Sequence, residues 1–440
     1  LAIGELGWMS MSIVDTIMVG RLPDSATAIG ATALGSGLFY TVSICCGGLL
    51  LGLDTLVSQS FGRGDVEDCN HSLLQALYIA AFLCPFLLAF DFYAPHLLAD
   101  FGIASSLVQG TKDFLYALAW SAPPLLAYFA LRRYLQAIHR VRIVMYALVS
   151  ANIINLGLNW LLIYPHYWSG RLVGGWGLAG SGWSTFWARI YMSGVLAAAL
   201  FYYNRVDRLH LRRTDPSLDW PRIKRLLQLG GPAATQIFLE IAVFSFTGIL
   251  AGKLGALPLA AHQIALQCAA LSYMVPLGVS AAAAVRTGNA WGRGELREAH
   301  HAGRAAVVLG CGFMALAAIL FVLIPRPLAR IFSPDPQVVA MGARLLLVAA
   351  AFQLFDGLQT VATGALRGIG STQLPMISNF IGYWIIGLPI GAVLCFHWGL
   401  GVFGLWIGLC IGLIVISVVL FGAWEKRFAE REGTRYSASA

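Results

Sequence analysis

Apolar stretches of about 20 residues follow one another along most of the chain, separated by short polar or glycine-containing segments. A helix of about 20 residues crosses the roughly 30 Å of hydrocarbon in a bilayer. The pattern therefore predicts twelve transmembrane helices. We place them near residues 1–20, 31–58, 72–90, 113–137, 144–164, 176–203, 224–251, 258–285, 304–325, 338–364, 373–396 and 399–424. Because Leu1 is not a Met and lies just inside the first of these helices, we expect a short N-terminal piece before it.

The composition agrees with a membrane protein. Of the 440 residues, 58% are hydrophobic and 11% are charged, whereas a soluble domain carries about 25% charged residues. A transmembrane barrel would show shorter, alternating segments, so the fold class is an all-α polytopic membrane protein. The eight cysteines include no CxxC pair, and we expect no metal site of that kind, no disulfide framework and no cofactor.

The positive charges are distributed unevenly between the two sides of the predicted membrane. Loops 2–3, 4–5, 6–7, 8–9 and 10–11 and the tail hold 21 of the 29 Lys and Arg residues, and the other loops hold seven. This bias places both termini in the cytoplasm. The protein is then a multi-pass inner-membrane protein in contact with lipid. No basic run is interleaved with aromatics, so we expect no nucleic acid partner despite the net charge of +8.

The chain repeats itself. The segments 62–65 and 292–295 read GRGD and GRGE, 230 residues apart, and Leu135 and Leu366 close the fourth and tenth spans at an offset of 231. Two halves of six helices each enter the membrane from the same side, which predicts a pseudo-twofold axis along the membrane normal. We therefore expect a substrate site in the cleft between two lobes. The predicted parts are an N-terminal six-helix lobe (1–203), a cytoplasmic linker (204–223), a C-terminal six-helix lobe (224–424) and a cytoplasmic tail (425–440).

Three carboxylates, Asp15, Glu240 and Asp356, lie within these apolar segments. An ionisable group at the centre of a bilayer costs at least about 2.5–3.5 kcal/mol on insertion scales. Three such residues on three helices indicate that these acids have a function. They would bind a cation, a proton or a cationic substrate.

In the N-terminal lobe, Asn155 and Asn159 share a helical face with Asn152, and Thr185 lies on the following helix. With Asp15, these amide and hydroxyl oxygens form a set of hard ligands suited to Na+. The alternative is that the Asn and Thr side chains join helices by hydrogen bonds.

Arg189 continues the helical stripe of Ser181 and Thr185. It pairs with Asp15 and replaces a bound cation, or it reaches a lipid headgroup or a backbone carbonyl. Glu5 and Asp54 are weaker candidates, because both are near the cytoplasmic side and fit interfacial or capping roles.

In the C-terminal lobe, Glu240 and Asp356 have no Lys or Arg facing them within their own spans. Two acids close together do not both ionise freely, so one holds a proton or a cation such as Na+ bridges them. The alternative is a structural hydrogen-bond pair. Amide side chains accompany the two acids; they are Gln236, Gln263, Gln267, Gln353 and Gln359.

Strings in four of the predicted spans resemble those of a known family. They are MSIVDTIMVG at 11–20, GP at 231–232 with Glu240, AAHQI at 260–264 with MVPLG at 274–278, and FQLFDGLQ at 352–359 with GALRG at 364–368. Over essentially its whole length the chain resembles the multidrug and toxic compound extrusion (MATE) family, NorM-like branch. The resemblance implies ion sites at Asp15, Asn155, Asn159 and Thr185, and at Glu240 and Asp356. Some relatives carry a second acid where Asn159 stands.

The resemblance implies a Na+- or H+-coupled antiporter that exports organic cations and amphipathic drugs by alternating access. The chain contains no GxxxxGK[ST] motif, so that route of nucleotide hydrolysis is excluded. The alternative is a flippase for a lipid-linked or other amphipathic substrate, which the acidic intramembrane charges disfavour. An intramembrane enzyme is disfavoured because Gly52-Leu53-Asp54 is only a fragment of a protease signature. We expect a monomer that is not an enzyme.

Overall fold

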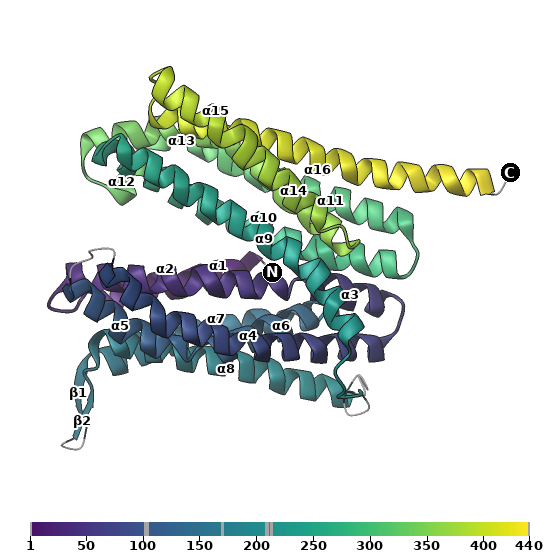
Figure 1. Cartoon of the computed structure of the whole chain (residues 1–440), viewed down its shortest axis with the longest axis horizontal. Coiled ribbons are helices and arrows are strands. Elements are labelled where there is room, and N and C mark those ends of the chain that lie inside the picture. The colour runs from purple at the N-terminus through teal and green to yellow at the C-terminus, as the bar shows by residue number, and fades with distance from the viewer. Residues whose placement is uncertain (1, 101–104, 169–170, 207–210, 212–213, 439–440) are drawn as a thin grey trace. The chain divides into compact units, whose positions relative to one another are not determined.

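The protein is built from helices and one short β-hairpin (Figure 1). The computed structural model describes residues 2–100, 105–168, 171–206, 211 and 214–438. The chain divides into two compact units, which we call the N-unit (Ile3–Gly230) and the C-unit (mainly Gly231–Ala440). Each unit has a large hydrophobic core of its own. Helix α9 contributes to both units, since the division falls between Gly230 and Gly231.

The elements of the N-unit match the predicted spans in order. They are α1 (Ala2–Val19), α2 (Ser25–Leu49), α3 (Gly52–Gly62), α4 (Val66–Asp100), α5 (Ser105–Ala119), α6 (Ala122–Ala137), α7 (Val141–Ile163), β1 (Pro165–Trp168), β2 (Arg171–Gly174) and α8 (Gly177–Val206). Helix α4, however, begins six residues before and ends ten residues after the predicted third span. The antiparallel hairpin β1–β2 was not predicted. Its second strand ends at Gly174 and Gly175, whose φ angles of 79° and 78° favour glycine.

Two predicted spans of the N-unit are each two helices. The second span breaks at Leu50 and Leu51, between α2 and α3. The fourth span bends by 48° between α5 and α6. Pro123 and Pro124 open α6, and a proline has no N–H to continue the hydrogen-bond ladder of the preceding helix.

The elements of the C-unit begin with α9. They are α9 (Trp220–Lys253), α10 (Ala256–Gly292), α11 (Leu296–Leu323), α12 (Pro325–Phe332), α13 (Pro336–Gly368), α14 (Gln373–Asn379), the π-helix η2 (Phe380–Gly387), α15 (Leu388–Ala392), the π-helix η3 (Val393–His397) and α16 (Val402–Ala438). The predicted eleventh span therefore alternates between α and π geometry. Pro389 lies between its two π segments.

The predicted repeat reappears in the backbone of both units. Gly64 and Gly294 have φ angles of 80° and 76°. Each donates its N–H at 3.0 Å to a carbonyl three residues earlier, on Phe61 and on Trp291. The turns that follow Leu135 and Leu366 also match, since each leucine accepts a hydrogen bond from the residue five positions later, at 2.8 and 2.9 Å. The two halves of the sequence thus fold through the same turns.

Glycines allow the closest helix contacts in each unit. A Cβ on Gly364 of α13 would lie 2.2 Å from the carbonyl oxygen of Ser280 in α10. A Cβ on Gly230 of α9 would lie 1.8 Å from the carbonyl oxygen of Leu49. Small residues at such contacts let helix backbones approach, which is how helices associate where lipid removes the hydrophobic driving force.

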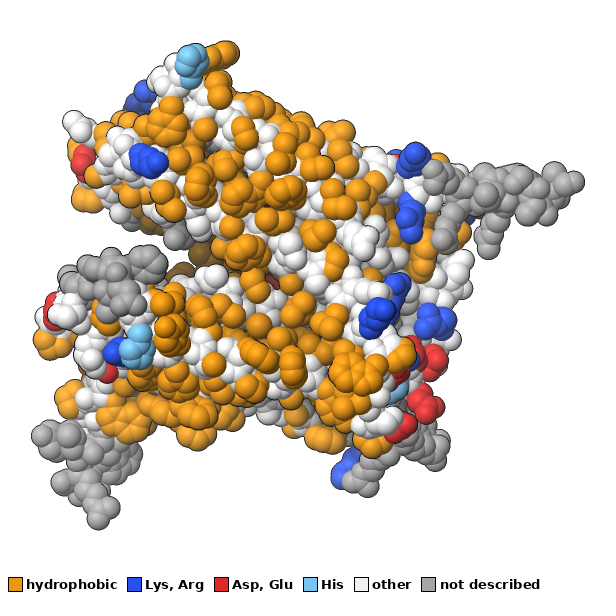
Figure 2. Space-filling view, in the orientation of Figure 1, with side chains coloured by type: hydrophobic (Ala, Val, Ile, Leu, Met, Phe, Trp, Pro, Cys, Tyr) orange, Lys and Arg blue, Asp and Glu red, His pale blue; other side chains and the backbone are white. Residues whose placement is uncertain are grey.

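Ten helices of the described chain are long and apolar enough to cross a membrane, or eleven if the bent pair α5–α6 is one span. Helix α1 occupies the position of the remaining predicted span. Hydrophobic side chains cover much of the visible helix surface, and charged side chains gather near helix ends (Figure 2). The predicted lobe, linker and tail boundaries stay a prediction.

Candidate functional site

Asp15 of α1 is the centre of a buried polar network in the N-unit. One of its carboxylate oxygens accepts a hydrogen bond from the Asn159 amide at 2.6 Å, and the other accepts one from the Thr185 hydroxyl at 3.0 Å. Asn159 also donates to Asn155 at 3.0 Å and accepts from Ser184 at 2.6 Å. All these side chains are at most 7% exposed. The structure therefore brings together Asp15, Asn155, Asn159 and Thr185 from three helices.

The donor set of this network fits a small hard cation only after a rearrangement. The carboxylate and amide oxygens of Asp15, Asn155 and Asn159 are the ligand type that Na+ prefers. In the structure, however, the oxygens of Asp15 and those of both Asn side chains already accept hydrogen bonds from Asn159, Thr185 or Ser184. A cation bound here would displace the Asn159 amide N–H from Asp15.

Arg189 of α8 turns away from this network. It donates to the Ser121 hydroxyl and, at 3.0 Å, to the Tyr40 hydroxyl, and its guanidinium lies 4.7 Å from the centre of the Phe39 ring. Within the part of the chain that the structure describes, no ion pair joins Arg189 to Asp15. The predicted pairing is therefore absent from this arrangement, although the two charges are close enough to interact.

The two weaker candidates of the N-unit are paired with arginines of α6. Glu5 accepts from Arg132, and both side chains are buried. Asp54 lies 3.4 Å from Arg133. These contacts give both acids a structural role in joining α1 and α3 to α6.

Glu240 and Asp356 occupy a different environment in the C-unit. Asp356 of α13 is 4% exposed, and Glu240 of α9 is half-buried. Among the described residues neither side chain has an ion-pair partner or a hydrogen bond, and the charge that acts on Asp356 is that of Glu240. The two acids are thus close enough to repel each other, and within the described ranges no Lys or Arg forms an ion pair with either of them.

Aromatic rings hold the helices that carry these acids. Phe352, one turn before Asp356, packs edge-on against Phe244 of α9 at 6.0 Å and against Trp406 of α16 at 5.7 Å. The Trp406 indole N–H donates to His262 of α10 at 3.1 Å. His262 therefore packs within the C-unit, and its second ring nitrogen is buried without a hydrogen bond.

The predicted glutamines separate into two groups. Gln359 accepts from the Tyr383 hydroxyl at 3.2 Å and donates to Asn379 at 3.3 Å, and Gln353 donates to Ser272. These two glutamines belong to buried polar contacts around α13. Gln263 is exposed on α10 and lies apart from these contacts.

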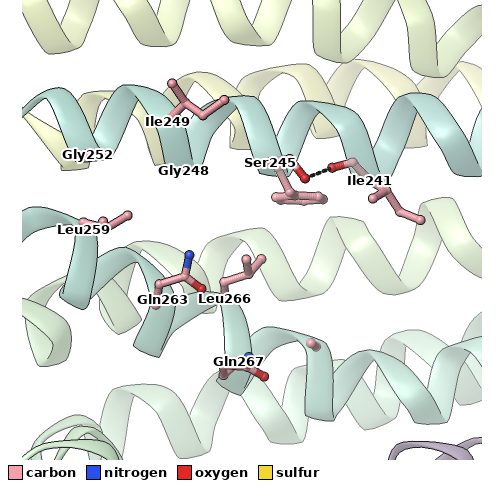
Figure 3. Close-up of a pocket in the computed structure, with 11 residues that line it drawn as sticks. Ile241, Ser245, Gly248, Ile249, Gly252, Leu259, Gln263, Leu266 and Gln267 are labelled. Carbon is pink, nitrogen blue, oxygen red and sulfur yellow. Dashed lines mark hydrogen bonds between the residues drawn. The ribbon is translucent and has the colours of Figure 1, made fainter. Parts of the chain in front are cut away.

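Gln263 and Gln267 line a pocket of about 660 Å³ between α9 and α10 (Figure 3). Its other walls are mainly apolar, and Phe244, Leu259, Leu266 and Ile249 contribute to them. Ile241, the residue after Glu240, also lines it. A mainly apolar cavity with a few polar groups is the usual form of a small-molecule site.

Sequence reasoning missed two polar residues of these regions, namely Asn379 and Asp91. Asn379 accepts a hydrogen bond from Gln359 and stands in a segment where no helical stripe of polar residues marks it. Asp91 lies one residue beyond the predicted third span. It is spaced three and four residues from the buried Ala94 and Leu87, and that periodicity was the available signal.

The comparisons with known proteins agree with this architecture. The chain matches the family described as MatE over residues 1–161 and 232–393. A probable multidrug resistance protein NorM from Brucella suis biovar 1 is 33% identical over 441 residues, which cover 97% of this chain and 92% of the relative. Another protein of that name, from Rhodopseudomonas palustris, is 37% identical over 432 residues, or 97% and 90% of the two chains.

Among solved structures, a crystal structure of a eukaryotic MATE transporter is similar with a TM-score of 0.84. It is 22% identical, and the alignment covers 98% of this chain and 95% of the other. The predicted fold class, an all-α polytopic membrane protein of two six-helix halves, is confirmed. The chain belongs to the MatE family, the multidrug and toxic compound extrusion family that its motifs resemble.

Proposed function

We propose that the protein exports organic cations and amphipathic drugs in exchange for Na+ or H+. The observation that carries this proposal is the pair Glu240 and Asp356, two acids that repel each other and have no basic partner among the described residues. Two further facts support it. The relatives are named as multidrug resistance proteins, and the pocket between α9 and α10 has mainly apolar walls.

The acid pair provides the coupling. A unit charge 4 Å from an opposite charge gains about 4 kcal/mol at an effective dielectric constant of about 20. A proton or Na+ that neutralises one of the two acids can therefore lower the affinity for a cationic substrate by up to about a thousandfold. By reciprocity, the bound substrate lowers the affinity for the ion by the same factor. Mutual exclusion of this kind is the requirement for antiport.

The remaining assignments follow from this mechanism. Gln353 and Gln359 position α13 and with it Asp356, while Gln263 lines the pocket for the apolar part of the substrate. Asp15, Asn155, Asn159 and Thr185 form a second cation site in the N-unit. We further propose that the protein works as a monomer in the inner membrane with both termini in the cytoplasm, and that it catalyses no chemical reaction.

Efflux of ethidium from proteoliposomes, with Na+ and H+ gradients imposed separately, tests the proposal. We expect one of the two gradients to drive efflux. Glu240→Gln and Asp356→Asn should each abolish gradient-driven efflux while the protein keeps its unfolding temperature. Glu298→Gln, which alters an exposed acid of α11, is the matched control and should transport normally. Wild-type efflux from both acid variants would contradict the assignment, and a folded wild type that ignores both gradients would favour a flippase.

A further inference from the structure

Asp91 is a further buried carboxylate within the helices, and its surroundings differ from those of Asp15, Glu240 and Asp356. It lies on α4, its side chain is 0% exposed, and it faces the core together with Leu87 and Ala94. Both of its carboxylate oxygens are buried, and neither has a hydrogen-bond partner. A buried carboxylate in its ionised form would be expected to accept several hydrogen bonds or to pair with a cation.

The titratable groups around Asp91 come from four helices. Arg189 of α8 is the cation whose charge reaches it, and Cys46 of α2 is close enough to interact with it. Cys84, on α4 itself, interacts with Cys46 in turn. From α5, the Tyr116 hydroxyl donates at 3.3 Å to the carbonyl of Phe92, the residue after Asp91.

Arg189 is shared between two acids. It is 0% exposed, and its charge acts on Asp91 as well as on Asp15. Its Nη1 and Nη2 groups donate to Ser121 and Tyr40, and its Nε–H is buried without a partner. Two carboxylates and one guanidinium leave one surplus negative charge in the buried interior of the N-unit. An uncompensated buried charge costs several kcal/mol, so one of the two acids must take up a positive charge.

The hydrogen bonds decide which acid does so. Asp15 accepts from Asn159 and Thr185, which stabilise its ionised form. Asp91 accepts from neither protein donors nor a cation in the described structure. Na+ would need several oxygen ligands around it, whereas the ionisable groups shown to interact with Asp91 are a guanidinium and a thiol. A proton needs no such set of ligands.

We propose that Asp91 is a proton-binding site of the N-unit and that Arg189 is a counter-cation shared between Asp91 and Asp15. When Asp91 holds its proton, the charge of Arg189 compensates Asp15. When Asp91 releases the proton, the guanidinium compensates Asp91 instead, and Asp15 becomes free to bind a cation. Proton binding at Asp91 and cation binding at Asp15 therefore oppose each other, with a coupling of about 5- to 150-fold.

The protonation of Asp91 is tested on the purified protein by infrared spectroscopy, without any transport. The carbonyl stretch of a protonated carboxyl is resolved from that of a carboxylate, and the difference between two variants isolates one residue. We expect Asp91→Asn to remove a protonated-carboxyl band that wild type shows at neutral pH. Asp113→Asn, which changes an exposed acid of α5, should leave that band unchanged. An Asp91→Asn spectrum equal to that of wild type would overturn the proposal.

The sharing of Arg189 is tested by the dependence of Na+-induced thermal stabilisation on pH. This test rests on the proposed role of Asp15 as a cation site. In wild type, Na+ should stabilise the protein more strongly as pH rises. In Asp91→Asn, the Arg189 guanidinium always compensates Asp15. At high pH the variant should therefore bind Na+ about 5- to 150-fold more weakly than wild type, and Na+ should stabilise it less. A wild-type profile in the variant would refute the sharing, and a wild type indifferent to Na+ would instead count against the cation site.

Asp91→Leu is the second variant. Because it removes an uncompensated acid it should fold, and unfolding of both variants would contradict the proposal.

Discussion

The Asn159→Asp substitution is expected to convert the self-contained network of the N-unit into one that depends on a cation. In wild type the Asn159 amide donates to Asp15 at 2.6 Å. A carboxylate at position 159 cannot donate when it is ionised, so the network loses a hydrogen bond to a charged group, worth about 1.5–3 kcal/mol. It gains a second negative charge at nearly the same place.

The size of the repulsion follows from this geometry. Even if the two carboxylates move apart to 4 Å, they repel each other by about 4 kcal/mol at an effective dielectric constant of about 20. A bound Na+ or a shared proton removes this repulsion. The substitution should therefore raise the affinity of the N-unit for a cation by up to about a thousandfold. Without the cation, the variant should be less stable than wild type by at least about 4 kcal/mol.

Thermal unfolding in detergent, in NaCl and in choline chloride of equal ionic strength, measures the effect. Na+ at a hundred times its dissociation constant adds about 2.7 kcal/mol of stability, so the Asn159→Asp variant should unfold at a clearly higher temperature in NaCl. The control is the exchange Asp15→Asn with Asn159→Asp, which restores one acid and one amide and should abolish the Na+ dependence. An Asn159→Asp variant that is as stable as wild type and indifferent to Na+ would refute the reasoning.

Two further predictions concern packing and charge within single units. Gly364→Ala should destabilise the protein by about 1–3 kcal/mol, because the new Cβ would lie 2.2 Å from the Ser280 carbonyl oxygen; Gly312→Ala, with nothing within 4 Å of its Cβ, should be neutral or slightly stabilising in the same unfolding assay. Glu5→Gln should cost about 3–5 kcal/mol by leaving the Arg132 charge buried and unpaired, and Glu5→Leu combined with Arg132→Met should recover most of that loss. Equal stability of the single and double Glu5 variants would argue against a buried ion pair.

Periodicity predicted the helices and part of the polar chemistry, because both depend on residues close in sequence. Spans of about 20 apolar residues marked the helices, and the four-residue spacing of Asn155 and Asn159 placed both on one face. The repeated GRGD and GRGE segments marked turns that need a glycine at positive φ, at Gly64 and Gly294. Each of these features can be recognised within a few residues of chain.

Features that depend on contacts between distant segments could not be predicted in this way. Arg189 donates hydrogen bonds to Ser121 and Tyr40 and forms no ion pair with Asp15. This depends on how α2, α6 and α8 pack, and the helical stripe that contains Arg189 does not reveal that packing. Asp91 was missed because the predicted third span ended at residue 90, whereas α4 continues through Pro95 to Asp100. The break between α2 and α3 lies in a continuous apolar run.

The acids of the two units are not duplicates of one ancestral site, although the backbone turns repeat. The strings Gly20-Arg21-Leu22 and Gly252-Lys253-Leu254 mark corresponding ends of α1 and α9. Asp15 lies five residues before the first string, whereas Glu240 lies twelve residues before the second. At 1.5 Å per residue the two acids differ in depth along their helices by about 10 Å. Their partners differ as well, since Asp15 is fully hydrogen-bonded and Glu240 and Asp356 are not. The repeat therefore preserves how the helices turn, while each proposed cation site is built from residues of its own unit. Loss of one site should weaken the coupling without disabling the other.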